Sequence, residues 1–378
     1  MPKIAIVAGE ASGDLLGAHL ISALKKQRGD LEFFGIAGPK MMREGASSLF
    51  PIEKLSVRGY VEVLKHLYGL FKLRRSLLKQ ILKENPAVFV GIDAPDFNFW
   101  LERKLKKAGI PTIHYVSPSI WAWRRGRISK IKRAVTHMLA LFPFEPALYE
   151  AAHIPVTFVG HPLADEIPLK PNKKAARETL KLKQSDFIVA MLPGSRQSEV
   201  AQHSALFVKT ARLIGEEHAN AIFLVPLITR NTRNIFETAL YKDLNNVPNV
   251  QILFGHAHDA MEAADMVIVA SGTATLEAAL LKRPMIITYR MPTISWQILK
   301  RMNYLPYVGL PNVLAGKFLV PELLQKDATP EKIADTVTKL VNDQDNLKTL
   351  KQEFSDIHTS LKQNAAKKAA EVVLSYLK

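Results

Sequence analysis

An aspartate directly after an apolar run is the residue of this sequence best suited to acid–base chemistry. Asp93 follows Ala87–Ile92 within the segment Gly-Ile-Asp-Ala-Pro-Asp-Phe-Asn. Ligands of doubly wound sheets bind beyond the carboxyl ends of the strands, so we expect Asp93 at such a site. A carboxylate there can take a proton from an attacking hydroxyl as a general base. The alternative is a cap, since Asx side chains often bond their own backbone; Asp96 and Asn98 are interpreted as turn and cap residues.

A glycine-containing loop follows the first apolar run, Ile4–Ala8, and reads Gly-Glu-Ala-Ser-Gly-Asp-Leu-Leu-Gly over residues 9–17. Its position before a helical pattern would offer backbone N–H groups to an anion. The spacing is neither that of a dinucleotide fingerprint nor that of a P-loop. Ser12, Gly13 and Asp14 are therefore candidates for a substrate-binding loop. The alternative is a turn in which Ser12 or Asp14 caps the helix.

Two loops in the second half suit a diphosphate. Leu-Pro-Gly-Ser-Arg ends one apolar run, and its arginine can pair with phosphate in a bidentate manner. Ser-Gly-Thr-Ala-Thr-Leu-Glu follows another run and opens a helix, where free N–H groups favour anions. The glutamate could bind ribose hydroxyls, or it could simply complement the helix dipole. The candidates from both loops are Gly194, Ser195, Arg196, Ser271, Gly272, Thr273 and Glu277.

Basic residues accompany apolar ones in two further segments. Trp121 and Trp123 lie beside three arginines, a combination that suits a phosphate with acyl chains, stacked bases, or core aromatics beneath a solvated basic face. The stretch Val63–Lys83 carries a broad apolar stripe flanked by cations, which is typical of an interfacial helix and also of an ordinary packed helix. Its candidate membrane or acyl contacts are Leu67, Leu70, Phe71, Arg74 and Arg75.

Metal chemistry is not favoured by any motif. The segment Asp343-Gln344-Asp345 lies between two helical patterns rather than after a strand, which favours helix capping. His256 and His258 lack nearby ligands in a recognised spacing. The sequence has no cysteine, so thiolate sites and disulfides are excluded. We therefore expect no metal and no cofactor.

Short apolar runs alternate with helical patterns, which predicts an α/β fold with parallel sheets. The polar segment Leu169–Ala175 is interpreted as a linker, after which the same rhythm restarts. We expect an N-terminal domain over 1–168, a second over 169–330, and helices without strands over 331–378, which could cross to the other domain or to a partner chain. The predicted strands are Ile4–Ala8, Glu32–Ile36, Ala87–Ile92, Thr112–Val116, His137–Leu141, Val156–Val159, Phe187–Leu192, Ala221–Val225, Val250–Leu253, Met266–Ala270 and Met285–Tyr289.

The chain of 378 residues has 51 Lys plus Arg against 35 Asp plus Glu, a formal charge of +16. That excess indicates an anionic partner: nucleic acid, a phosphorylated substrate or an acidic membrane surface. No apolar stretch approaches the roughly 20 residues that span a bilayer. The first residues predict a buried strand rather than a signal peptide.

Taken together, several segments resemble the lipid-A-disaccharide synthase family. They are spread in the family's order over nearly the whole chain, and Gly-Ile-Asp-Ala-Pro-Asp-Phe-Asn and Tyr-Val-Ser-Pro-Ser-Ile-Trp-Ala-Trp are the most specific. The segments are 9–17, 91–98, 114–124, 142–145, 158–163, 192–196, 271–277, 289–290, 310–312 and 323–325.

The resemblance implies a GT-B type glycosyltransferase with two Rossmann-like doubly wound domains facing a central cleft. It implies inverting, metal-independent transfer of 2,3-diacylglucosamine from UDP to 2,3-diacylglucosamine 1-phosphate, giving a β(1→6)-linked disaccharide 1-phosphate and UDP. Asp93 matches the family's essential aspartate, and Asn312 is expected to shape the UDP-sugar side. The resemblance places Ser12, Gly13 and Asp14 on the acceptor or sugar side. The implied location is the cytoplasmic face of a bacterial inner membrane, with an anionic lipid surface and no nucleic acid as partner. Monomer and homodimer both stay open.

Three rival functions remain at this point. The nearest is another UDP-sugar enzyme of the same fold, such as an N-acetylglucosamine transferase or an epimerase. A basic nucleic-acid-binding protein would show steeply salt-dependent binding. An NAD-dependent oxidoreductase is disfavoured because no acidic residue ends the second strand near Ile36.

Overall fold

The computed structural model of the chain describes residues 1–55, 60–242, 248–302 and 304–377, without the side chains of 60–68, 294, 298 and 299. The chain divides into two compact units, Met1–Asp165 with Leu361–Lys378, and Glu166–Ser360. The boundary therefore lies three residues before the expected position 168/169. The end of the helical segment that begins at 331 belongs to the first unit.

The first unit is built on a seven-stranded parallel sheet in the order β3-β2-β1-β4-β5-β6-β7. Most of its strands are runs buried on both faces, as parallel strands under two helical layers must be. The strands are β1 Lys3–Ala8, β2 Glu32–Ile36, β3 Ala46–Ser48, β4 Val88–Ile92, β5 Thr112–Tyr115, β6 His137–Ala140 and β7 Val156–Phe158.

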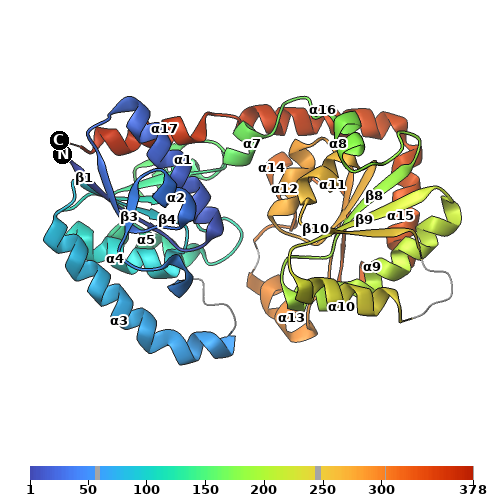
Figure 1. Cartoon of the computed structure of the whole chain (residues 1–378), viewed down its shortest axis with the longest axis horizontal. Coiled ribbons are helices and arrows are strands. Elements are labelled where there is room, and N and C mark those ends of the chain that lie inside the picture. The colour runs from blue at the N-terminus through green and yellow to red at the C-terminus, as the bar shows by residue number, and fades with distance from the viewer. Residues whose placement is uncertain (56–59, 243–247, 303, 378) are drawn as a thin grey trace. The chain divides into compact units, whose positions relative to one another are not determined.

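Helices cover both faces of this sheet (Figure 1). α1 packs against α2 and α17 on one face, and α4 packs against α3 and α5 on the other. The helices are α1 Ala11–Gln27, α2 Pro39–Arg43, α3 Tyr60–Glu84, α4 Pro95–Lys107, α5 Ile128–Ala134, α6 Pro146–Glu150, α7 Pro162–Glu166 and α17 Ala365–Ser375.

The last helix, α17, is part of the first unit's core. Ala365, Ala369 and Val373 are fully buried in the same cluster as the residues of β1. The Asp165 carboxylate accepts hydrogen bonds from the backbone N–H groups of Asn364 (2.9 Å) and Ala365 (2.6 Å) at the start of this helix. The chain leaves the first unit after Asp165 and returns to it at Leu361, and these hydrogen bonds join the two segments.

The second unit contains a six-stranded parallel sheet in the order β10-β9-β8-β11-β12-β13. Alternate residues of a strand face opposite sides of a sheet, and Val189 and Met191 of β8 pack on the same side. The strands are β8 Phe187–Leu192, β9 Ala221–Leu227, β10 Val250–Phe254, β11 Met266–Val269, β12 Met285–Tyr289 and β13 Glu322–Leu324.

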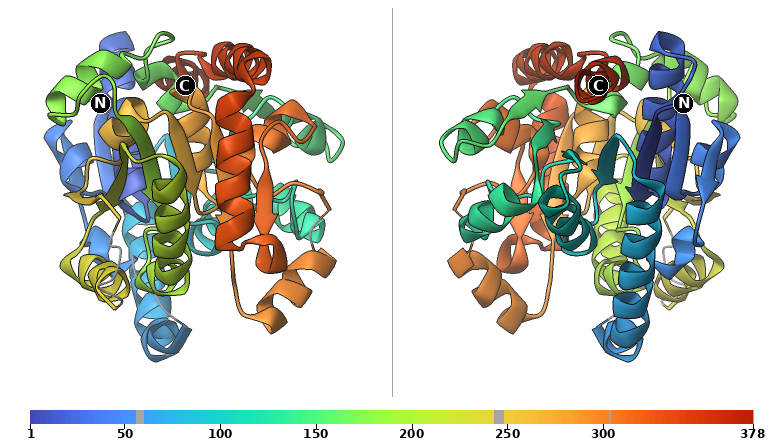
Figure 2. Two further views of the ribbon diagram at one scale, coloured as in Figure 1. Left: turned by 90° about the vertical axis from the view of Figure 1, so that its right-hand side faces the viewer. Right: turned by 90° about the vertical axis from the view of Figure 1, so that its left-hand side faces the viewer.

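The side to which Val189 points is covered by α9, α10 and α15, and α9 and α15 lie side by side (Figure 2). α11 packs against α8 and α12, and α12 packs against α14. The helices are α8 Lys173–Thr179, α9 Gln197–Glu217, α10 Arg230–Leu240, α11 Ala257–Ala263, α12 Thr273–Leu280, α13 Thr293–Met302, α14 Leu310–Ala315, α15 Pro330–Asn342 and α16 Gln344–Leu361.

Each predicted strand is present, with ends shifted by two residues at most. The short strands β3 and β13 were not predicted. The expected linker Leu169–Ala175 is helical in its last three residues, because Asn172 caps α8 by accepting from the N–H of Ala175. The described residues include no helix of the length and apolarity needed to cross a membrane.

Candidate active site

β1 and β4 are neighbours in the sheet of the first unit. The direction in which successive strands are added reverses between them, from β1 toward β3 on one side and from β4 toward β7 on the other. Such a reversal makes the loops beyond the two strands diverge, and ligands of doubly wound folds bind there. The loop after β1 carries the glycine-containing segment 9–17, and the loop after β4 carries Asp93. Two predicted site segments are thus brought together at the sheet's switch point.

The two loops touch so closely that one of them needs a glycine. A Cβ placed on Gly9 would lie 2.6 Å from the Cβ of Ala94, far inside van der Waals contact. Asp93 and Ala94 both have left-handed backbone, with φ of 50° and 44°. Such φ values are costly for residues with side chains and cluster at functional sites. The strained pair turns the chain from β4 into α4.

The Asp93 side chain is half-buried, and its carboxylate has no hydrogen-bond partner within the part of the chain that the structure describes. Its backbone is fixed instead. The N–H of Asp93 donates to Tyr115 O (2.9 Å), and its C=O accepts from Asn98 Nδ2 (2.8 Å). Capping of α4 is therefore not the role of the Asp93 carboxylate, which stays available to a ligand.

A buried pair of polar side chains, Glu102 and His114, lies next to the end of β4. Glu102 Oε1 is 2.7 Å from Nδ1 of His114, and both side chains are fully buried. Burial raises the pKa of Glu102, while the adjacent His114 opposes that rise. Gly91 makes room for the pair, because a Cβ there would lie 2.2 Å from Glu102 Oε1. This group supports the β4 turn from inside.

The candidates on the glycine-containing loop differ in their exposure. Ser12 is exposed, whereas Gly13 packs against Ala8 and is buried. The carboxylate of Asp14 is buried and accepts from the backbone N–H groups of Lys40 and Met41, both at 3.0 Å. Asp14 therefore caps α2, and its oxygens face that helix.

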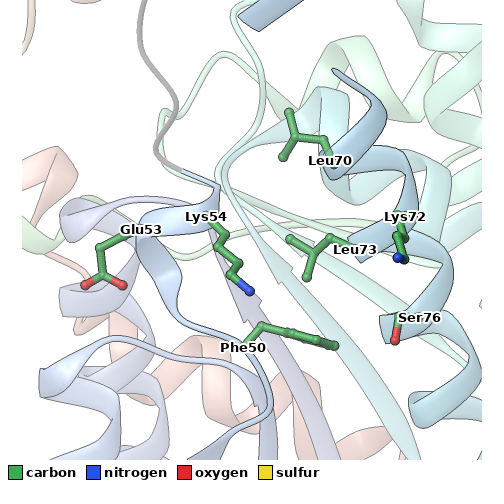
Figure 3. Close-up of a pocket in the computed structure, with 8 residues that line it drawn as sticks. Phe50, Glu53, Lys54, Leu70, Lys72, Leu73 and Ser76 are labelled. Carbon is green, nitrogen blue, oxygen red and sulfur yellow. The ribbon is translucent and has the colours of Figure 1, made fainter. Parts of the chain in front are cut away.

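An apolar pocket of about 650 Å³ lies between α3 and the segment after β3 (Figure 3). Its apolar lining residues are Phe50, Leu70 and Leu73. Its charged lining residues are Lys54, Lys72 and Glu53, and the Lys54 side chain points between Phe50 and Leu73 (Figure 3). Apolar walls with two lysines and one glutamate among the lining residues suit an acyl chain attached to an anionic group. Leu70, predicted as an acyl contact, lines this pocket.

The other predicted contacts on α3 are exposed or bridge to α4. Phe71 is 50% exposed, which is high for a large apolar side chain, and Arg75 is also exposed. The guanidinium of Arg74 lies 4.4 Å from the ring centre of Trp100 and 5.1 Å from that of Phe71. Leu67 is on α3, but its side chain lies outside the described residues.

The two candidate tryptophans follow β5. The ring of Trp121 packs edge-on against Phe144 at 5.3 Å and Phe142 at 6.4 Å between ring centres. Trp123 stacks with the guanidinium of Arg124 at 4.1 Å. Both tryptophans are half-buried, so each combines packing within the loops with a surface open to a ligand.

In the second unit the strand order reverses between β8 and β11. The loops beyond them are the two predicted diphosphate loops. Gly194 has φ of 126°, and a Cβ there would lie 2.5 Å from the Cβ of Glu199. The Glu199 carboxylate accepts from the N–H groups of Ser195 (3.1 Å) and Arg196 (3.2 Å). These two N–H groups are thus taken, while the Arg196 side chain is 72% exposed and lies 3.4 Å from Glu199.

A buried histidine connects this loop to the end of β12. His203 Nδ1 is 2.9 Å from Pro193 O, and its Nε2 accepts from the N–H of Arg290 at 3.0 Å. These partners require a neutral ring with the proton on Nδ1. Burial lowers the pKa of His203, which favours that neutral form. His203 therefore holds the Leu192–Arg196 loop at a fixed distance from Arg290.

The loop after β11 leaves donors exposed. Gly272 has φ of 139° and begins α12, and within the described chain the N–H groups of Gly272, Thr273 and Ala274 have no acceptor. Ser271 is half-buried beside them. Glu277 lies further along α12, and its Oε1 is 3.1 Å from His258 Nδ1. That hydrogen bond raises the pKa of His258.

Asn312 is fully buried, and its amide is completely used within the protein. Nδ2 donates to Val320 O (2.9 Å) and Glu322 Oε1 (2.8 Å), while Oδ1 accepts from the N–H groups of Leu319 and Val320. Glu322 in turn accepts from the N–H groups of Val308 and Gly309. Asn312 can shape this side of the unit but has no group left for a ligand.

Sequence reasoning missed Glu199, His203, Glu102 and His114. Glu199 had a signal, since a glutamate at the third position of a helix commonly binds N–H groups of the preceding loop. The two histidines had none, because neither the strand pattern around His114 nor the helical pattern around His203 indicates which distant group the ring will contact.

Nearly the whole chain matches one protein family, and a similar protein over its full length has a name that corresponds to that family. The model of the lipid-A-disaccharide synthetase family matches residues 4–375. A lipid-A-disaccharide synthase of Methylobacillus flagellatus is 66% identical over 378 residues, covering 100% of both chains. Among solved structures, UDP-GlcNAc 2-epimerase from Neisseria meningitidis bound to UDP-GlcNAc is similar with a TM-score of 0.63, 13% identity and 99% coverage of both chains. The glycosyltransferase of kitacinnamycin is similar with a TM-score of 0.64, 15% identity and coverage of 100% and 99%. The predicted GT-B type fold is confirmed.

Proposed function

The chain belongs to the lipid-A-disaccharide synthase family, a family of glycosyltransferases in lipid A biosynthesis, and we propose that it transfers 2,3-diacylglucosamine from UDP to 2,3-diacylglucosamine 1-phosphate with inversion. The acceptor 6-hydroxyl oxygen forms a bond to C1 of the donor as the bond from C1 to the UDP oxygen breaks. The products are the β(1→6)-linked disaccharide 1-phosphate and UDP.

Asp93 is the general base of this proposal. The observation that carries it is a half-buried carboxylate without a hydrogen-bond partner among the described residues, fixed by its backbone at the switch point of the first sheet. A base must reach the hydroxyl proton and must not be engaged elsewhere. Asp93 meets the second requirement, whereas Asp14 does not, because its two oxygens cap α2. The Ser12 and Gly13 segment then borders the sugar.

The departing UDP gains negative charge, and the second unit has donors for it. The exposed guanidinium of Arg196 and the N–H groups of residues 272–274 lie on the loops of β8 and β11, at that sheet's switch point. Donors in place before the reaction stabilise developing charge at little reorganisation cost. Glu277, held by His258, is assigned to the ribose hydroxyls, and Asn312 to positioning of the nearby loop.

The acyl chains and the membrane are assigned to the first unit. The apolar pocket beside α3, the exposed Phe71 and the cations Arg74 and Arg75 form a surface suited to acyl chains and anionic headgroups. Trp121 and Trp123 add amphipathic rings of the kind enriched at membrane interfaces. We propose peripheral attachment to the cytoplasmic face of the inner membrane. The charge of +16 then reflects lipid and phosphate rather than nucleic acid.

The decisive experiment follows UDP release and disaccharide formation from the two acylated sugars, in wild type and in Asp93→Asn. We expect disaccharide from wild type and at most a trace from the variant, with UDP binding retained because Asp93 is not on the UDP side. Asp96→Asn is the matched control, since that exposed carboxylate pairs with Arg127. Near-normal transfer by Asp93→Asn would refute its role as base. UDP release without disaccharide would refute the proposed acceptor.

A further inference from the structure

The second unit has a separate pocket at the end of its sheet opposite to the UDP loops. A cavity of about 350 Å³ opens where β8, β11 and β12 begin, beside Phe187, Met266 and Pro284. Arg196 and Ser271 follow the other ends of β8 and β11. A molecule in this cavity would therefore lie a full strand length from the proposed donor site.

The lining of this pocket is strongly basic. Five cations line it, namely Lys173, Lys282, Arg283, Lys348 and Lys351, and Asp265 is the one acid among its described lining residues. The charge of Asp265 is already compensated, because its oxygens pair with Lys173 and with the buried Arg177 (2.7 Å). A net positive potential therefore remains in the pocket.

Arg283 is the unusual member of this group. Only 8% of it is exposed, yet its guanidinium forms no hydrogen bond within the part of the chain that the structure describes, and Nε is entirely shielded. Burial lowers the pKa of Arg283, although Glu262 and Asp265 are near enough to oppose that change. Buried guanidinium groups almost always have partners, since an unpaired buried charge is costly. Arg283 is thus a lining residue of the pocket whose guanidinium has no hydrogen-bond acceptor among the described residues.

We propose that this pocket binds the terminal phosphate group of a small soluble molecule. The planar guanidinium of Arg283 donates two parallel hydrogen bonds to two phosphate oxygens, a geometry that suits this pair. Lys348 and Lys351, which are exposed on α16, add positive charge at the entrance. Lys282 is excluded from direct contact, because its ammonium already bonds Leu280 O and His358. The site is independent of the proposed transfer reaction.

The test uses inorganic pyrophosphate, titrated calorimetrically into the full chain at constant ionic strength, with and without saturating UDP. Arg283→Gln should weaken pyrophosphate binding at least tenfold in the presence of UDP, and Lys351→Glu should weaken it severalfold. Lys339→Glu, an exposed change of equal charge outside the pocket, should bind as wild type does. Equal binding by all four proteins would overturn the proposal.

Two controls keep the result interpretable. Arg283→Gln removes a buried charge that has no hydrogen-bond partner among the described residues, so without pyrophosphate its melting temperature should equal or exceed that of wild type. If that variant fails to fold, the comparison of Lys351→Glu with Lys339→Glu carries the test, because both positions are exposed. Arg283-dependent attachment to phosphatidylglycerol vesicles without pyrophosphate binding would overturn the assignment to a soluble phosphate.

Discussion

The contact between Gly9 and Ala94 gives a quantitative test of how the two loops of the first unit are held. In Gly9→Ala the new Cβ would meet the Ala94 Cβ at 2.6 Å, about 1 Å inside ordinary contact, so the loops must separate. Overpacking of this kind costs about 1–3 kcal/mol. Separation by about 1 Å also displaces the turn that carries Asp93, and such misplacement can reduce catalysis on the order of 100-fold.

Removal of the Ala94 side chain should relieve this clash. In Ala94→Gly the nearest remaining atom to a Cβ on residue 9 is the Cα of residue 94 at 3.9 Å, which is ordinary contact. Ala94→Gly alone should be near neutral, because relief of the left-handed φ is worth about 1–2 kcal/mol and glycine's extra chain entropy costs about 0.5–1 kcal/mol. Gly9→Ala should therefore be destabilising in wild type and close to harmless in Ala94→Gly.

The measurement is urea unfolding of the four proteins of this cycle, with transfer rates alongside. Gly29→Ala is the control, because a Cβ at Gly29 meets no atom within 4 Å. A coupling free energy between the two substitutions near zero would refute the reasoning, as would a Gly9→Ala protein as stable and active as Gly29→Ala.

Four further predictions concern other parts of the molecule. Arg196→Ala should weaken UDP binding by about 10–100-fold and lower kcat, because a charge-assisted hydrogen bond is worth about 1.5–3 kcal/mol; unchanged kinetics would remove Arg196 from the donor site. His203→Phe leaves Pro193 O and the Arg290 N–H unpaired and should cost about 2–5 kcal/mol in urea unfolding, so an unchanged midpoint would contradict the proposed bridge. Phe71→Glu should reduce binding to anionic vesicles in a sedimentation assay without loss of fold, whereas Tyr241→Glu, at a comparably exposed position in the second unit, should not. Burial lowers the pKa of His161 to about 4 from 6.5, so the unfolded chain binds the proton first and stability should fall by about 3 kcal/mol as pH drops from 6.5 to 4; His161→Asn should flatten that slope in pH-dependent unfolding.

The fold could be predicted because most of its longer strands are buried on both faces. Runs such as Phe187–Leu192 must be apolar throughout, and this makes both their position and their parallel arrangement readable. β3 and β13 were not predicted because each has three residues, Ala-Ser-Ser and Glu-Leu-Leu, and a stretch of three is too short to form a recognisable apolar run. Their pairing depends on neighbouring strands rather than on their own sequence.

The site was predictable to the level of loops and not to the level of side-chain partners. Strand ends and glycines identify Asp93 and Gly194 as residues of switch-point loops, since local sequence determines both features. Whether a polar group faces a ligand or a neighbour depends on contacts far along the chain. Asp14 bonds residues 26 and 27 positions away, and its sequence neighbourhood is compatible with either role. The hydrogen bond between Asn312 and Glu322, which are ten positions apart, is likewise not predictable from the local sequence.

The attachment of α17 to the first unit makes the second unit an insertion within the first. Residues 166–360 interrupt a core whose last contributors, Ala365–Val373, follow them in the chain. During synthesis the second unit can therefore complete its core first, although the first unit begins at residue 1. The core of the first unit stays incomplete beside α1 until α17 has been synthesised and packs there. Loss of α17 should consequently impair the unit that carries Asp93, while the unit that carries Arg196 should fold without it.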